Sequence, residues 1–264
     1  IPLPDWEVLS KDKNNEDILE NYINAPIWGK EARNSSATSF SMKRSINTVS
    51  SRGCPFACKF CFRGAQGERN YGIRSPENLF CEMKLYVEKY GIDFLGYVDD
   101  NFAVSRKRIF DLEHLVGDWV DKNRLVWGTH ARLDEAADIK SSENSSIELN
   151  TPLRVNSMYN AGCRYIGFGA ESASPRMLEL MGKGGSMLRH GVEEVFGFDV
   201  PVTMMVGIKN TIEAGIHANC TWIMGYPGET LDDLKATVAF IKWQEEVLME
   251  RYLKNSRYWN LASE

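Results

Sequence analysis

Three cysteines lie within eight residues, in the segment Cys54-Pro-Phe-Ala-Cys58-Lys-Phe-Cys61. Thiolates at this spacing on one loop can ligate a metal centre from one side. A structural zinc site needs a fourth protein ligand, often from a second paired Cys or His motif, and no such motif follows because the four histidines are isolated. An iron–sulfur cluster held by three cysteines leaves one iron for a non-protein ligand. The spacing therefore favours a cluster, with zinc as the alternative.

The remaining cysteines, Cys81, Cys163 and Cys220, are scattered singly. Isolated cysteines of this kind are expected to be small buried hydrophobes. Disulfides suit short secreted chains better than a chain of 264 residues. The first residues also lack the basic and apolar regions of a signal peptide. We therefore expect free thiols and a cytoplasmic location.

Composition sets further limits on function. Hydrophobic residues make up 43% and charged residues 25% of the chain, which is typical of a globular protein. Lys plus Arg is 31 and Asp plus Glu is 36, so the net charge is 31 − 36 = −5. This balance gives no general attraction to nucleic acid. No apolar run approaches the roughly 18 residues that a membrane span requires. We expect neither a nucleic-acid partner nor a membrane span.

Strand and helix patterns alternate from residue 46 onward, which predicts a parallel α/β sheet with right-handed crossovers. The predicted strands are 46–50, 92–98, 125–129, 163–169 and 217–224. The predicted helices are 76–90, 105–120, 152–161, a helix beginning at Ser174-Pro175, and one beginning after Thr230. Polar and Gly-rich residues follow the strands. Because the catalytic and binding residues of parallel α/β folds lie at the carboxyl ends of the strands, we expect the functional site at that edge of the sheet.

Three stretches fit this pattern less well. Residues 1–45 are polar and weakly patterned, and we expect an N-terminal linker or wrapping segment there, with residues 46–264 forming the main domain. Residues 134–151 are polar and rich in Ser and Asn, which predicts a loop. Residues 186–216 are ambiguous: two helices flanking an apolar run at 200–206 are one interpretation.

The cysteine motif, with the aromatic Phe60 directly before Cys61, resembles the signature of the radical S-adenosylmethionine (SAM) superfamily. The resemblance extends over most of residues 46–245. It implies a partial (β/α)6 TIM-like barrel, and a 4Fe–4S cluster bound by Cys54, Cys58 and Cys61. The amino and carboxylate groups of SAM would bind the remaining iron. Five predicted strands without a clear sixth suggest a barrel that is truncated or completed by another chain.

The resemblance also implies positions that contact SAM. Asp99 and Asp100 follow the second predicted strand, where the family holds the methionine amine; the alternative is a solvated turn. Arg132 follows the third strand and would pair with the methionine carboxylate, the alternative being a surface arginine. Glu171 and Ser172 follow the fourth strand, at the family's ribose position.

Gly225 begins the turn Gly225-Tyr-Pro-Gly-Glu229-Thr after the fifth strand, which is similar to the adenine-contacting turn. A plain strand-to-helix turn is the alternative there.

The order of motifs is most similar to the cobalamin-dependent branch, which includes anaerobic magnesium-protoporphyrin cyclase-like enzymes and methyltransferases. Members usually carry an upstream cobalamin-binding domain, which is not recognisable in this sequence. The resemblance implies an enzyme of transferase or oxidoreductase type that cleaves SAM reductively and abstracts hydrogen from a substrate. We expect a small-molecule substrate undergoing methylation, cyclisation or rearrangement, and an electron donor such as flavodoxin or ferredoxin.

Three other interpretations stay open. The first is a radical SAM enzyme that modifies RNA or protein, although the basic RNA-binding domain and second cluster typical of that group are not visible. The second is a non-catalytic iron–sulfur scaffold, which an incomplete barrel would fit. The third is a zinc-stabilised binding module.

Overall fold

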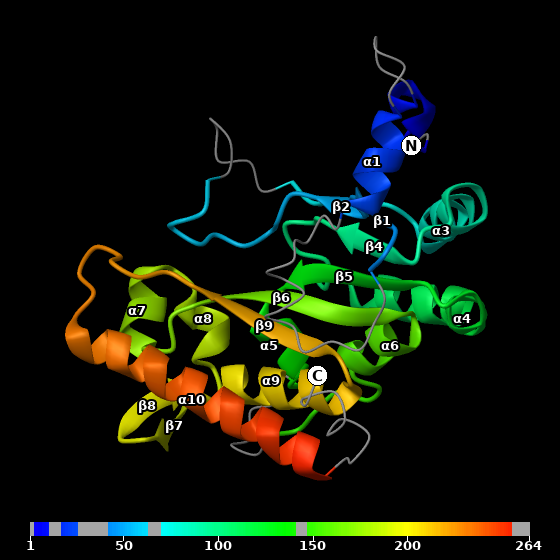
Figure 1. Cartoon of the computed structure of the whole chain (residues 1–264). Coiled ribbons are helices and arrows are strands. Elements are labelled where there is room, and N and C mark those ends of the chain that lie inside the picture. Colours follow the sequence, from blue (N-terminus) through cyan, green and yellow to red (C-terminus); the bar gives the residue numbers. More distant parts are fainter. Residues whose placement is uncertain (1–2, 11–16, 26–41, 63–69, 141–146, 255–264) are drawn as a thin grey trace.

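A computed structural model describes residues 3–10, 17–25, 42–62, 70–140 and 147–254 (Figure 1). Its centre is a five-stranded parallel sheet in the order β1-β4-β5-β6-β9. The strands are β1 (Ser45–Thr48), β4 (Phe94–Tyr97), β5 (Val126–Ala131), β6 (Cys163–Glu171) and β9 (His217–Trp222). The predicted α/β class and the five parallel strands are confirmed. Each strand pairs with the next one in sequence along the sheet, as in a barrel opened at one side.

Helices connect the strands and cover one face of the sheet (Figure 1). They are α3 (Pro76–Tyr90), α4 (Arg106–Asn123), α5 (Leu133–Ala137), α6 (Arg154–Asn160), α7 (Pro175–Leu180), α8 (Gly184–Met187), α9 (Val202–Ala214) and α10 (Leu231–Lys254). Their starts follow capping rules: the Ser75 side chain accepts a hydrogen bond from the Asn78 N–H, and Pro76 occupies the first turn. Gly91 ends α3 at φ 62°.

The core lies between the sheet and these helices. Tyr97, Phe102 and Trp127 form an aromatic cluster within it, in which the Phe102 and Trp127 ring centroids are 4.9 Å apart. All three side chains are fully buried. Aliphatic side chains from α3, α4 and α9 complete the core around this cluster. Burial of these side chains supplies the main driving force that fixes the strand ends in place.

Two connections differ from the sequence prediction. Part of the predicted loop 134–151 is the short helix α5, at whose start the Glu135 carboxyl group accepts a hydrogen bond from the Arg132 N–H at 3.3 Å; five residues are too few to show a helical period. The apolar run 200–206 is not a single element. It contains the end of a hairpin, β7 (Val192–Val195) and β8 (Phe198–Pro201), and the start of α9. Helix α9 is buried on several sides, and its buried residues include the polar Thr203, Asn210 and Thr211.

The part of the chain that the structure describes contains five parallel strands, as expected for a partial barrel without a clear sixth strand; after β9 the chain enters α10. One further expectation needs correction. Cys81 is exposed on α3 instead of buried, whereas Cys163 is buried. No helix in the described ranges is both long and apolar enough to cross a membrane.

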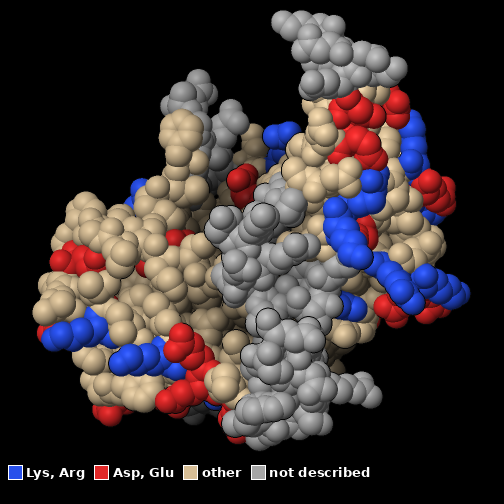
Figure 2. All heavy atoms as spheres, viewed as in Figure 1, with Lys and Arg blue, Asp and Glu red and all other residues tan. Residues whose placement is uncertain are grey.

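Two described helices belong to the N-terminal segment, the 3-10 helix η1 (Trp6–Leu9) and α1 (Ile18–Asn24). η1 packs against α3, and α1 packs against η1 and β1. The Trp6 indole donates a hydrogen bond of 2.8 Å to the Tyr86 hydroxyl and stacks on Tyr22 with centroids 5.6 Å apart. Around α1 and α3, acidic and basic side chains lie next to one another on the face shown in Figure 2.

A glycine sets the spacing between α5 and α9. A Cβ added at Gly207 would overlap the carbonyl oxygen of Leu133, so the two helices approach backbone to backbone. We expect Gly207→Ala to lower the free energy of unfolding by about 2 kcal/mol, because steric strain exceeds the gain in helix propensity. Gly117→Ala is the matched control, because its Cβ would lie 3.6 Å from the Asn160 carbonyl oxygen. Equal stability of both variants in urea unfolding would contradict this packing.

Candidate active site

The segment that carries the three closely spaced cysteines, residues 53–62, is here called the Cys loop. It leaves the sheet after β1 and connects β2 (Ser51–Arg52) to its antiparallel partner β3 (Gly72–Ile73). Figure 1 shows it on the same side as the turn after β9, at the carboxyl edge of the sheet. Cys54 and Cys58 are half-buried, Cys61 is exposed, and all three thiols are free. The three cysteines therefore lie at the edge where the sequence predicts the site.

Backbone contacts fix the Cys loop at both ends. The Lys59 N–H donates to the carbonyl oxygen of Met181, at the end of α7, at 2.8 Å. Gly53 begins the loop at φ 82°, and an added Cβ would overlap the Asn70 carbonyl oxygen. The Gly53 N–H donates to the Asp100 carboxylate at 3.1 Å. Phe60 is half-buried within the loop.

Asp99 and Asp100 are both brought to the start of the Cys loop, but they point to different environments. Asp99 is 3% exposed, and its carboxylate accepts hydrogen bonds from the Ser50 N–H at 2.6 Å, from the Ser51 hydroxyl at 2.6 Å and from the Ser50 hydroxyl. Arg108 donates to the Ser50 carbonyl oxygen at 3.0 Å. Asp99 therefore organises the end of β1, whereas Asp100 is exposed and holds Gly53.

Arg132 caps α5 and packs directly against the Cys loop. Its Nη1 lies 3.6 Å from Cys58 Sγ, and its guanidinium carbon lies 3.9 Å from the centroid of the Phe56 ring. Nε donates to Asp134 at 2.9 Å and Nη2 donates to the Ser186 hydroxyl at 2.7 Å. The residue is 7% exposed. It is therefore a buried cation at the cysteines and not a surface arginine.

Glu171 and Ser172 are neighbours in sequence but point to different parts of the fold. Glu171 has a positive φ of 66°, and Lys183 donates to its Oε1 at 3.2 Å and to the Gly169 carbonyl oxygen. Lys183 itself is 4% exposed. Ser172 is fully buried, with its hydroxyl 3.3 Å from that of Thr237 in α10. Its side chain thus fastens α10 and does not reach the open edge.

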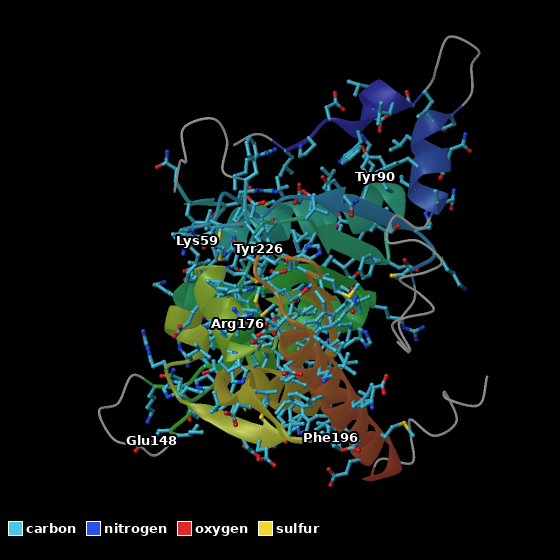
Figure 3. The ribbon with its side chains drawn as sticks, turned by 90° about the vertical axis from the view of Figure 1, so that its left-hand side faces the viewer. Lys59, Tyr90, Glu148, Arg176, Phe196 and Tyr226 are labelled. Atoms are coloured by element: carbon cyan, nitrogen blue, oxygen red, sulfur yellow. The ribbon has the colours of Figure 1, made fainter. Side chains whose placement is uncertain are left out.

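The turn after β9 lies beside α7. Gly225 has φ 77°, and its N–H donates to the Glu229 carboxylate at 2.6 Å. A Cβ at Gly225 would meet open space, so its left-handed backbone, and not crowding, favours glycine there. Arg176 of α7 donates to the Gly228 carbonyl oxygen at 2.7 Å. Figure 3, which looks onto this edge, shows Lys59, Tyr226 and Arg176 on the Cys loop, this turn and α7.

Sequence reasoning missed several residues around the Cys loop. The structure adds contacts from Phe56, Asp134, Ser186 and Lys183. These residues belong to no recognisable motif, and the contacts of Arg132 with Phe56 and Ser186 join segments that are far apart in sequence. In the described ranges, no three His, Cys, Asp or Glu side chains form a group that could hold one metal ion.

Burial raises the pKa values of two groups near this edge, Cys54 and Glu135. Desolvation is the largest cause that raises the pKa of the Cys54 thiol. Desolvation also raises the pKa of Glu135 to about 7, and the negative charge of Asp134 adds to this effect. A hydrogen bond of 2.9 Å from the Asn101 side chain opposes it. Glu135 therefore retains a proton at a pH where an exposed carboxyl group is ionised.

This raised pKa predicts a specific pH dependence. The folded protein holds the Glu135 proton more tightly than the unfolded chain, so the stabilisation is complete below about pH 4.5 and is lost as the pH rises through about 7. The free energy of unfolding of the wild type, relative to Glu135→Gln, should fall by about 3 kcal/mol across this range. Urea unfolding at several pH values measures it, with exposed Glu148→Gln as control. Parallel pH curves for wild type and Glu135→Gln would contradict the expectation.

Comparison with known proteins places these features in context. Residues 48–241 match the radical SAM superfamily. The chain is 26% identical over 242 residues to an uncharacterised methyltransferase of Pyrococcus horikoshii, covering 92% of this chain and 41% of that protein. It is 23% identical over 246 residues to the anaerobic magnesium-protoporphyrin IX monomethyl ester cyclase of Cereibacter sphaeroides, covering 92% of this chain and 32% of that protein. The chain thus spans less than half the length of either relative.

Two solved structures share the fold. One is the cobalamin-dependent S-adenosylmethionine radical enzyme OxsB with aqua-cobalamin and S-adenosylmethionine bound, with a TM-score of 0.59 and 19% identity over 75% of this chain and 26% of that one. The other is the radical S-adenosylmethionine methyltransferase TsrM of Kitasatospora setae, with a TM-score of 0.55 and 20% identity over 76% of this chain and 32% of that one.

Proposed function

The chain belongs to the radical SAM superfamily, and we propose that Cys54, Cys58 and Cys61 bind a 4Fe–4S cluster that acts on SAM at the carboxyl edge of the sheet. The observation that carries this proposal is the set of three free thiols on one loop, fixed to that edge by Gly53 and Lys59. Thiolates are the ligands of such clusters.

The chemistry of the donor set fits the group. Each thiolate of a 4Fe–4S cluster binds a different iron, so the three sulfurs need not converge on one point. The Arg132 guanidinium lies beside Cys58 Sγ, and a hydrogen-bond donor of this kind stabilises a ligating thiolate. When bound, the cluster supplies the electron that cleaves the sulfonium of SAM.

The residues around the Cys loop would bind and orient SAM. We assign the exposed Asp100 to the methionine amine, with Asp99 holding the end of β1 through Ser50 and Ser51. Lys183 orients the Glu171 carboxylate, whose second oxygen suits a ribose hydroxyl. Phe60 and the backbone at Gly225 would contact the nucleoside.

The substrate is assigned only by class. The names of the relatives, a methyltransferase and a cyclase, support methylation or ring closure of a small molecule, with rearrangement as a third reaction of this type. They support an enzyme of transferase or oxidoreductase type. We further propose that it works in the cytoplasm with flavodoxin or ferredoxin as electron donor. Cobalamin would be bound by an upstream domain outside this sequence. Residues 1–45 would then be the segment that links such a domain to the barrel domain, residues 46–264.

Anaerobic reconstitution tests this function. We expect about four irons and four sulfides per chain, and 5′-deoxyadenosine release from SAM after reduction with dithionite. A loaded cluster without 5′-deoxyadenosine would indicate an iron–sulfur scaffold. Bound zinc with no iron after reconstitution would indicate a zinc-stabilised module. Either of these outcomes would overturn the proposed enzyme.

A further inference from the structure

Arg132 contacts the Cys loop through two different groups. Nη1 lies 3.6 Å from Cys58 Sγ, while the guanidinium carbon lies 3.9 Å above the Phe56 ring. The arginine side chain is 9% exposed, and that of its partner Asp134 is 13% exposed. The cation is therefore held against the sulfur in a poorly solvated place, where electrostatic interactions are stronger than in water.

The Nε and Nη2 nitrogens of Arg132 already donate hydrogen bonds to other partners within the protein. Nε and Nη2 donate to the two oxygens of Asp134 at 2.9 and 3.3 Å, and Nη2 also donates to the Ser186 hydroxyl at 2.7 Å. A carboxylate is best bound by two parallel N–H groups on one edge of the guanidinium. Asp134 occupies the Nε–Nη2 edge, and Cys58 and Ser186 accept from Nη1 and Nη2 on the other edge, so the methionine carboxylate would have to displace one of these partners.

We propose that Arg132 is a positioning residue that raises the reduction potential of the cluster by stabilising negative charge on the Cys58 sulfur, and that it is not the ligand of the methionine carboxylate. This inference rests on the proposed cluster. Reduction adds one negative charge to the cluster, and a fixed cation with an N–H directed at a ligating sulfur stabilises that charge. Asp134 moderates the effect, because it partly neutralises the same cation.

The test is an EPR-monitored redox titration of the reconstituted protein without SAM. In Arg132→Gln, we expect the ratio of reduced to oxidised cluster at a fixed potential to fall about tenfold, which for one electron is a midpoint lower by about 59 mV. Arg164→Gln is the matched control. The Arg164 guanidinium carbon lies 3.8 Å from the centroid of the Tyr159 ring, near the amino end of β6 and away from the Cys loop. The cluster of this variant should have the same midpoint potential as that of the wild type.

A second variant gives a change of opposite sign. Asp134→Asn removes the negative partner and keeps the side-chain shape, so the reduced cluster should become more stable and the midpoint should rise. Loosening of the Cys loop alone would not shift the midpoint potentials of the two variants in opposite directions. If Arg132→Gln does not retain a cluster, Asp134→Asn decides: a wild-type midpoint in that variant overturns the proposal.

Two other outcomes separate the hypotheses. A wild-type midpoint in fully loaded Arg132→Gln, with SAM affinity lowered tenfold or more, would assign Arg132 to the methionine carboxylate and overturn the inference. Failure of the wild-type protein to assemble any cluster would instead overturn the proposed function on which the inference rests. Unchanged SAM affinity with a lowered midpoint is the result that we expect.

Discussion

Replacing Cys58 with alanine is expected to lower 5′-deoxyadenosine formation by about 10³-fold or more, because the chemistry belongs to the cofactor and not to the protein. Two cysteines cannot hold the cluster and leave a single open iron. Iron and acid-labile sulfide, measured after anaerobic reconstitution, should fall in parallel with the activity. The same result is expected for Cys54→Ala and Cys61→Ala.

Cys81→Ala provides the matched control for this prediction. Cys81 is a free cysteine like Cys58, but it is exposed and lies on α3, outside the Cys loop. Its replacement should leave the iron content and the activity unchanged. Wild-type iron, sulfide and activity in Cys58→Ala would show that the Cys loop does not hold the cluster.

Gly53→Ala should cause the second largest loss, of about 100-fold in SAM cleavage, because small displacements of reacting groups have effects of this size. Gly53 combines φ 82° with a Cβ position that overlaps the Asn70 carbonyl oxygen, so an alanine must displace the start of the Cys loop or its partner β3. The sheet lies outside this contact, and the far-ultraviolet circular dichroism spectrum should stay the same. Activity and iron content measure the effect.

Gly72→Ala is the control that separates local displacement from general damage. Gly72 pairs with Arg52 in the same two-stranded ribbon, and an added Cβ would meet no atom within 4 Å. This variant should keep its cluster and its activity. Equal activity of Gly53→Ala and Gly72→Ala would show that the constraint at Gly53 does not position Cys54.

Much of the fold could be predicted because its signals are local. Ser75-Pro76 and Gly91 delimit α3, and Thr230 with Asp233 begins α10, because capping depends on residues a few positions apart. The five strands appear as short apolar runs that precede polar turns. By contrast, α5 has only five residues, and its first turn is held by a hydrogen bond from the Arg132 N–H to the Glu135 side chain.

The site was only partly predictable, because the sequence does not reveal which way neighbouring side chains point. Asp99 and Asp100 are equivalent in sequence, yet the first is buried among serines and the second is exposed. Ser172 follows Glu171 but contacts α10. The contact between Arg132 and Cys58 joins residues 74 positions apart, and only the parallel sheet brings them together.

The most direct test of the central claim is electron–nuclear double resonance on the reduced, reconstituted protein with SAM labelled in its amino nitrogen and carboxylate oxygens. We expect hyperfine couplings from both labels to the cluster, because three cysteines leave one iron open to SAM. A fully loaded cluster that shows no coupling to either label would contradict it.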